Sequence, residues 1–251
     1  MQCLRYLEYI LSGPTTAAAD VAALILEPVQ GHGGWIVPPK EFLPGVEKIC
    51  REHDILLIFD EIITGFGRTG KMFCYEHYDN SPDILILAKG ITSGFPLSAC
   101  VSSEEIMSVW TTFKHTSTYS AYPLGCAIAL ASIETIEREG LVEKSARMGK
   151  YALKRLKEME EEYSIVGEAR GLGMMFGLEI VKDKESKKPG VEEIKKIYTR
   201  ALKKGLILQP PGGQYRNVIK MSPPLVITEE QLECGLNILD ETVKEVDREA
   251  R

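Results

Sequence analysis

The sequence lacks the features that mark membrane and secreted proteins. It has no run of about 18 apolar residues, the length that a transmembrane helix needs. Residues 1–11 have an amphipathic helical pattern and lack the charged and then apolar order of a signal peptide. We therefore expect a cytoplasmic protein with no membrane partner.

Cysteine and histidine are sparse and scattered. None of the six cysteines forms a Cys-x-x-Cys pair, and the four histidines show no spacing typical of metal ligands. This pattern predicts buried thiols in a reducing compartment. We expect neither a disulfide framework nor a structural metal site.

The chain also lacks an excess of basic residues. Its formal net charge is −6 and its pI is about 5.4, which argues against nucleic acid as a partner. With 44% hydrophobic and 26% charged residues, the composition is that of an ordinary globular protein. The length of 251 residues allows one large domain or two smaller ones.

Apolar runs of strand length alternate with helical patterns in the first half of the chain. Runs of 4–8 apolar residues between turn signals are typical of strands buried on both faces of a parallel sheet. The predicted strands are Val21–Leu26, Leu56–Phe59, Ile84–Leu87 and Leu97–Ser102, and the predicted helices are Pro39–His53, Ser103–Trp110 and Pro123–Glu139. The alternation predicts an α/β domain with a mainly parallel sheet.

The pattern changes after Glu139. The helix Leu141–Glu162 is followed by the order ββαββα, which is typical of a compact α+β domain. Its predicted elements are Ser164–Ala169, Met174–Val181, Val191–Lys204, Gly205–Leu208, Val218–Met221 and Thr228–Glu245. We therefore predict two domains, the larger in residues 1–139 and the smaller in residues 140–251.

Two of the predicted strands end abruptly in a charged residue. Asp60 follows the first of these strands and Lys89 follows the next one. The carboxyl ends of parallel strands share one edge of a sheet, where ligands bind. An acid and an amine placed there can hold a pyridinium nitrogen and an aldehyde carbon, which points to pyridoxal phosphate. The simpler alternative is that Asp60 caps a helix and Lys89 is a solvated strand end.

A glycine motif between these strands points to a different cofactor. Gly65-x-Gly67-x-x-Gly70 matches the pattern of dinucleotide-binding proteins. In those proteins, however, the glycines lie at the first turn out of the strand, and the next strand ends in an acid. Here the next strand ends in Lys89. We expect these glycines to shape a turn that Arg68 anchors.

Several ordered motifs resemble those of class III aminotransferases. The segments Leu56–Gly70 and Pro82–Gly90 are similar to the signature of this pyridoxal-phosphate-dependent family. Further matches are Glu27–Gly31, His115–Tyr119, Arg170–Gly173 and Asn217–Pro224. The resemblance implies the aspartate-aminotransferase fold (fold type I), with residues 1–139 forming the C-terminal part of the large cofactor-binding domain.

The resemblance also implies roles for individual residues. Lys89 would attach the cofactor covalently and carry a proton, and Asp60 would pair with the ring nitrogen. Ile62 would pack on the ring, although it could equally be ordinary core. Thr118 would bind the cofactor phosphate of a neighbouring subunit, which implies a homodimer, or a dimer-based oligomer, with shared sites. Without the resemblance, Thr118 is as easily a loop threonine.

Two further residues would contact the substrate. Arg170 matches an arginine that holds the substrate carboxylate, which suits the fork of a guanidinium group. Glu27 matches a glutamate that can pair with this arginine, although it could also only cap its strand. Neither role involves a metal.

The sequence departs from the family at several points. Ile63 replaces the glutamine of 4-aminobutyrate enzymes, His32 stands where an acid or alanine is usual, and Ser120–Pro123 replaces a Gly-Gly-Asn-Pro turn. No glycine-rich phosphate loop precedes Val21. We therefore expect the 251-residue chain by itself to bind the cofactor weakly and to turn over poorly.

The leading hypothesis is an aminotransferase that moves an amino group from an amino acid to a 2-oxo acid. The expected donor is an ω-amino acid such as 4-aminobutyrate. A racemase or aminomutase on the same fold is an alternative, because these enzymes use the same lysine and aspartate. A third hypothesis is a catalytically incomplete fragment that acts as an assembly module.

Overall fold

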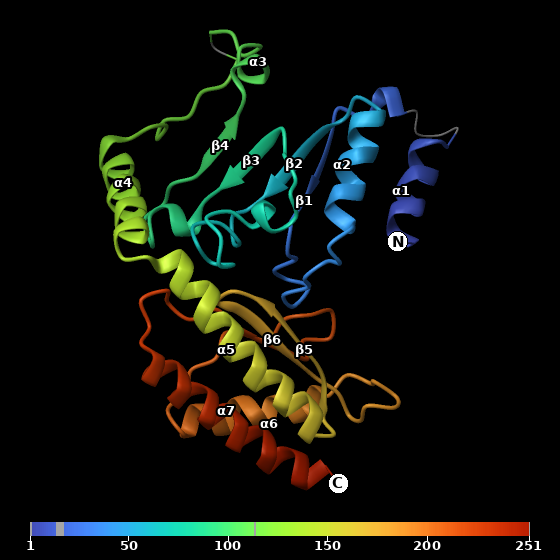
Figure 1. The fold of residues 1–251 in the computed structure, drawn as a ribbon, viewed down its shortest axis with the longest axis vertical. Helices are drawn as coiled ribbons and strands as arrows, with labels where there is room; N and C mark the ends of the chain where they lie inside the picture. The colour runs from blue at the N-terminus through green and yellow to red at the C-terminus, as the bar shows by residue number, and fades with distance from the viewer. Residues whose placement is uncertain (1, 14–17, 113, 251) are drawn as a thin grey trace. The chain divides into compact units, whose positions relative to one another are not determined.

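The chain folds into two compact units (Figure 1). The computed structural model describes residues 2–13, 18–112 and 114–250. The first unit contains the residues up to Pro28, Pro38–Phe66 and Lys71–Glu139; the second contains Val29–Val37, Gly67–Gly70 and the residues from Gly140 onward. Two short segments that the sequence suggests for the first domain are thus grouped with the second unit. No helix in the described part of the chain is long and apolar enough to cross a membrane.

A four-stranded sheet forms the centre of the first unit. Its strands are β1 (Ala23–Leu26), β2 (Leu56–Asp60), β3 (Ile84–Leu87) and β4 (Ala99–Ser102), in the order β1-β2-β3-β4. The first three strands are parallel, and β4 runs antiparallel to β3. The prediction of an α/β fold with a mainly parallel sheet is confirmed.

The first unit also contains helices. They are α1 (Gln2–Leu11), α2 (Phe42–Glu52), α3 (Glu104–Met107) and α4 (Pro123–Arg138), with short 3-10 turns η1 (Ala18–Asp20), η2 (Cys74–His77) and η3 (Lys89–Ile91). Helix α2 packs against β2, and α1 packs against α2 (Figure 1). Helix α3 is shorter than predicted. None of its residues is buried, and Val109 and Trp110 beyond it are exposed, so no packing stabilises a longer helix.

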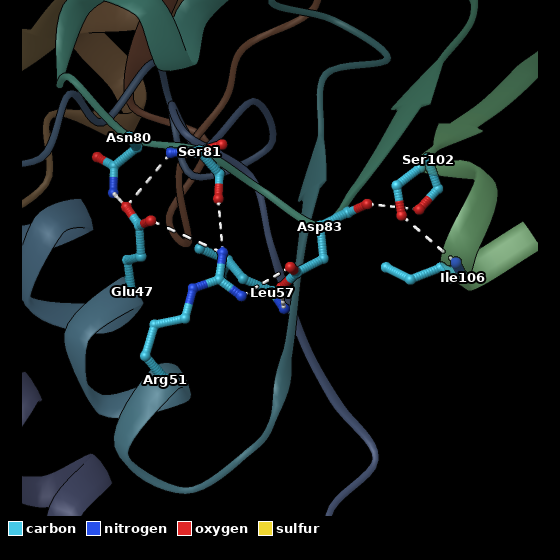
Figure 2. Close-up of polar contacts among 9 residues, drawn as sticks. Glu47, Arg51, Leu57, Asn80, Ser81, Asp83, Ser102 and Ile106 are labelled. Carbon is cyan, nitrogen blue, oxygen red and sulfur yellow. Dashed lines mark hydrogen bonds and ion pairs between the residues drawn. The ribbon is translucent and has the colours of Figure 1, made fainter.

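One polar cluster, which we call the amino-end clamp, joins the elements at the amino ends of β2 and β3 (Figure 2). It is centred on Asp83, whose carboxylate accepts hydrogen bonds from Arg51 of α2 at 2.6 and 2.8 Å and from the Leu57 amide at 2.7 Å. The Asp83 carbonyl accepts a hydrogen bond from Ser102 Oγ at 2.6 Å. The clamp therefore ties α2, β2 and β4 to the residue that precedes β3.

The second unit is an antiparallel sheet with helices. Its elements are α5 (Leu141–Glu162), β5 (Val166–Leu172), β6 (Met175–Ile180), α6 (Val191–Lys203), β7 (Val218–Met221) and α7 (Glu229–Ala250), and its strand order is β5-β6-β7. Helix α5 packs on β5, and α6 packs on α7. Fully buried side chains such as Leu156, Phe176, Leu178 and Leu239 form its core.

The predicted strand Gly205–Leu208 is wrong, so the order after α5 is ββαβα. Gly205 has a φ of 89°, and the Leu206 amide donates back to the Ala201 carbonyl of α6. This C-terminal cap uses the amide group, and Pro210 and Pro211 have none to offer to a neighbouring strand. The alternating apolar pattern of the segment instead reflects Leu206 and Leu208 packing on the core while Ile207 is exposed.

Candidate active site

Three charged residues follow three adjacent parallel strands of the first unit. Glu27 comes directly after β1, Asp60 is the last residue of β2, and Lys89 begins the turn η3 just after β3. Because these strands are parallel neighbours, their carboxyl ends lie at one edge of the sheet. The structure therefore brings the predicted residues Glu27, Asp60 and Lys89 to this edge, which we call the carboxyl edge.

The carboxylate of Asp60 is held by the backbone. Asp60 lies opposite Ile86 in the β2–β3 pairing, and its Oδ1 accepts a hydrogen bond from the Ile62 amide at 3.0 Å. Within the described residues, Oδ2 has no hydrogen-bond partner. The half-buried carboxylate can therefore accept a hydrogen bond from an N–H group of a ligand. Ile62, also half-buried, follows Glu61 in the turn.

The backbone at Lys89 adopts an uncommon conformation. Its φ is 45°, in the left-handed region, and its carbonyl accepts hydrogen bonds from the amides of Thr92 and Ser93. Such strained positions cluster at functional sites. The exposed Lys89 amine has no ion-pair partner within the described residues. It is thus available for bonding to a ligand.

Packing holds the lysine turn in place. A Cβ atom at Gly90 would lie 3.0 Å from the Cβ of Phe66, so a larger residue would displace that ring. Ser132 Oγ of α4 donates to the Gly90 carbonyl at 3.3 Å and lies 3.1 Å from Ser93 Oγ. The turn that carries Lys89 is therefore anchored to both a loop and a helix.

These groups fit pyridoxal phosphate at two positions, the ring nitrogen and the aldehyde carbon. Asp60 offers a carboxylate oxygen for a protonated ring nitrogen, and Lys89 offers an amine for the aldehyde carbon. Across the described ranges, no three His, Cys, Asp or Glu side chains group together to hold a metal ion.

Thr118 lies in an exposed turn between α3 and α4. In the same connection Ala121 has a φ of 51°, a conformation that glycine adopts more easily. The departure from the family's glycine-containing turn therefore coincides with backbone strain. The role of Thr118 at a subunit interface stays a prediction.

Arg170 belongs to the second unit, where other groups already engage it. It lies on β5 opposite Gly177 of β6, and its Nε donates to the Gly34 carbonyl at 2.9 Å. Its Nη1 contacts Glu168 at 2.6 Å and Glu179 at 2.7 Å, and only 12% of the side chain is exposed. A substrate carboxylate would compete with these two acids, and the predicted role of Arg170 stays a prediction.

The glycine-rich segment forms a turn, as predicted. Gly67 and Gly70 have φ values of 82° and 88°. Arg68 donates to the carbonyls of Met174 at 3.2 Å and Pro223 at 2.6 Å, which anchors the segment within the second unit. Burial lowers the pKa of Arg68 to about 10, so it stays charged at neutral pH.

No role for the acid next to Asp60 was predicted from the sequence. Glu61 is completely buried, and it accepts hydrogen bonds from Thr64 Oγ1 and from the amides of Cys74 and Tyr75. Burial raises the pKa of Glu61, and these hydrogen bonds oppose the rise. The available signal was periodicity, because Glu61 shares a strand face with the buried Leu57 and Phe59.

Comparison with known proteins identifies the family. The model of the aminotransferase class-III family matches residues 1–243. The chain belongs to the class III aminotransferases. Enzymes of this family depend on pyridoxal phosphate, so the predictions of family, fold and cofactor are confirmed.

The relatives of this chain include two kinds of enzyme. A leucine/methionine racemase from Thermococcus litoralis is 41% identical over 98% of the chain and 55% of its own length, and an alanine/serine racemase from Pyrococcus horikoshii is 42% identical over 96% and 50%. A probable 4-aminobutyrate aminotransferase from Bacillus subtilis is 39% identical over 90% and 52%.

Solved structures share the fold. A transaminase from a marine Virgibacillus bacterium matches 99% of the chain and 58% of its own length, with a TM-score of 0.92 and 35% identity. The chain thus spans about half the length of the relatives that it matches.

Proposed function

We propose that the protein is a pyridoxal-phosphate-dependent aminotransferase of the cytoplasm, which transfers an amino group from an ω-amino acid to a 2-oxo acid. One observation carries the proposal: Asp60 ends β2 and Lys89 follows the adjacent parallel strand β3 at the carboxyl edge, and each has bonding capacity that the described residues do not use. Parallel sheets bind their ligands at this edge.

Each residue has a distinct task. The bound cofactor supplies the electron sink that stabilises negative charge at the substrate carbon. Asp60 Oδ2 would accept a hydrogen bond from the protonated ring nitrogen and keep that proton in place. Lys89 Nζ would take the proton from the amino-bearing carbon of the substrate. Ile62 covers the ring with an apolar surface that excludes water.

The identity of the donor is supported by relatives that act on ω-amino acids. They include the probable 4-aminobutyrate enzyme of Bacillus subtilis and a 5-aminovalerate aminotransferase from Pseudomonas aeruginosa, which is 40% identical. Because Ile63 replaces the glutamine of the 4-aminobutyrate enzymes, the donors to be tested include longer ω-amino acids. In this proposal Arg170 and Glu27 bind the substrate.

A shared active site is also part of the proposal. Thr118 would bind the cofactor phosphate of a second subunit, so the working unit would be a homodimer. Light scattering gives the mass in solution, and a Thr118→Ala variant with weaker cofactor binding would support the shared site.

Amino-acid racemisation is the second candidate, because two relatives that are 41% and 42% identical are racemases. The same two residues serve this reaction, in which Lys89 would exchange the proton on the α-carbon of the substrate. The two functions differ in whether a 2-oxo acid is consumed.

One experiment separates the two functions. The purified protein with pyridoxal phosphate is incubated with L-methionine or 5-aminovalerate, with and without 2-oxoglutarate, and the products are separated by chiral chromatography. A transaminase forms glutamate only when 2-oxoglutarate is present, whereas a racemase forms D-methionine without it. If neither product forms, or if Lys89→Ala forms them equally fast, the proposal is wrong.

A further inference from the structure

Two carboxylates stand side by side at the end of β2 but face different surroundings. Asp60 is half-buried at the carboxyl edge and keeps one oxygen without a partner in the described chain. Glu61 is completely buried on the face of Leu57 and Phe59. Because successive side chains of an extended segment point to opposite faces, the contacts of Glu61 set the direction in which Asp60 points.

Both oxygens of Glu61 accept hydrogen bonds. Oε2 accepts from the Cys74 amide at 2.6 Å and from Thr64 Oγ1 at 3.0 Å, and Oε1 accepts from the Tyr75 amide at 2.9 Å. No Lys or Arg pairs with Glu61 in the described part of the chain. Neutral donors that lie 3 to 14 positions further along the chain therefore hold this carboxylate in place.

The backbone around Glu61 connects these contacts to Asp60. The Glu61 amide donates to the Ile86 carbonyl of β3 at 2.9 Å, and the Glu61 carbonyl accepts from the Gly65 amide at 3.1 Å. The next amide, that of Ile62, donates to Asp60 Oδ1. Rotation of the Glu61 backbone would therefore break the hydrogen bond from the Ile62 amide that orients the Asp60 carboxylate.

We propose that Glu61 is a positioning residue for Asp60. It fixes the peptide that follows Asp60, so that the Ile62 amide holds Oδ1 and Oδ2 is directed to the ligand. The proposal rests on the proposed function in one respect: the ligand of Oδ2 is taken to be the ring nitrogen of the cofactor.

The variant Glu61→Gln tests this role with almost no change in volume. A glutamine amide keeps one acceptor oxygen but brings an NH₂ group against donors that need acceptors, so at least one contact of Glu61 is lost. The matched control is Asp83→Asn, because Asp83 is also a carboxylate that accepts a backbone amide of β2, but at the amino end of the sheet.

The first readout needs no cofactor. Amide hydrogen exchange by NMR measures the opening of the Ile62–Asp60 hydrogen bond directly. We expect Glu61→Gln to speed exchange at Ile62, Cys74 and Tyr75 about tenfold, the effect of losing one charge-assisted hydrogen bond. Asp83→Asn should speed exchange at Leu57 and leave that at Ile62 unchanged.

The second readout uses the loaded enzyme. Because Asp60 would pair less well with the ring nitrogen, Glu61→Gln should lower kcat about tenfold with little change in KM for the amino donor. It should also move the pH midpoint of the cofactor absorbance, whereas Asp83→Asn should move neither kcat nor this midpoint.

The exchange data can overturn the proposal by themselves. If Glu61→Gln speeds exchange at Cys74 and Tyr75 but leaves that at Ile62 unchanged, Glu61 only anchors the loop. If Glu61→Gln does not fold, Glu61→Asp, which shortens the side chain by one methylene, gives the same comparison. A wild-type protein that binds no cofactor through Lys89 would refute the proposed function, while the Ile62 result would still decide the role of Glu61.

Discussion

The two ends of the sheet in the first unit use their charged residues differently. At the amino end, both carboxylate oxygens of Asp83 are occupied by Arg51 and the Leu57 amide (Figure 2). At the carboxyl edge, the Lys89 amine and one oxygen of Asp60 have no partner among the described residues. The same residue types thus stabilise the fold at one end and remain available to a ligand at the other.

The difference in surroundings has an energetic basis. Arg51 is 47% exposed, so its ion pair with Asp83 contributes at most about 1 kcal/mol. The partly buried hydrogen bond to the Leu57 amide adds a contribution of about 1 kcal/mol. Lys89 gains no such stabilisation and sits on a strained backbone, which folding alone does not favour. We therefore expect substitutions at the amino end to affect stability and those at the carboxyl edge to affect activity.

The largest effect is expected for Lys89→Ala. Removal of the amine should lower activity about 10⁴-fold, because both the attachment of the cofactor and proton transfer are lost. The melting temperature without cofactor should not fall, since the side chain is exposed. Activity assays and thermal denaturation measure both quantities, and a large loss of stability would contradict the comparison.

Asp60→Asn should lower activity about a hundredfold. The asparagine oxygen can still accept the Ile62 hydrogen bond, but the charge that holds a protonated ring nitrogen is removed. Steady-state kinetics and the cofactor absorbance measure the effect. Activity equal to that of the wild type would remove Asp60 from the site.

At the amino end, Asp83→Ala should lower the free energy of unfolding by about 2 kcal/mol. Urea denaturation measures this loss. The activity of the folded fraction should stay within about twofold of the wild type, because distant sites act independently. A large drop in activity at a temperature where the variant is folded would show that the two ends are coupled.

The buried Glu61 should make stability depend on pH. Burial raises its pKa above the ordinary value of 4.5, so the native state binds the proton more tightly than the unfolded state. The stabilisation that Glu61 gives the native state is therefore complete below the pKa of Glu61 in the unfolded state. It is lost as the pH rises through the raised pKa of Glu61 in the folded state. Thermal denaturation of wild type and Glu61→Gln should show the advantage of the wild type shrinking as the pH rises from 4.5. A constant difference would contradict this sign.

The smallest effect is expected for Ala121→Gly. Ala121 has a φ of 51°, and relief of this strain should outweigh the greater freedom of glycine in the unfolded chain. The free energy of unfolding should rise by about 0.5 kcal/mol, with activity unchanged. A loss of stability would show that Ala121 makes contacts that offset its strained backbone.

Much of the fold follows from local patterns. The strand Leu56–Asp60 and the helix Leu141–Glu162 coincide with an uninterrupted apolar run and a helical repeat between clear turn signals. The prediction was wrong at Gly205–Leu208, because a helix cap and two prolines prevent pairing even though the apolar pattern alternates. Pairing depends on free amide groups, which hydropathy does not report.

The candidate site also has features that the sequence predicts and features that it does not. The placement of Asp60 and Lys89 at one edge of the sheet could be predicted because each charge follows a strand-length apolar run, and parallel neighbours bring such ends together. The partners of Arg170 could not be predicted from the sequence, because they include the carbonyl of Gly34, which is 136 positions away in the chain.

The sequence by itself determined the family through its ordered motifs, and it determined the parallel sheet and the placement of Asp60 and Lys89 at one edge, because apolar periodicity and strand-end charges are local properties of the chain. Only the tertiary structure decided which groups hold the buried Glu61. Glu61 differs from Asp60 because the amides of Cys74 and Tyr75, 13 and 14 positions away, fold back onto it. The alternation along β2 indicates the face on which Glu61 lies, but the donors that compensate the desolvation of its carboxylate are distant in the chain, and no local pattern reports them.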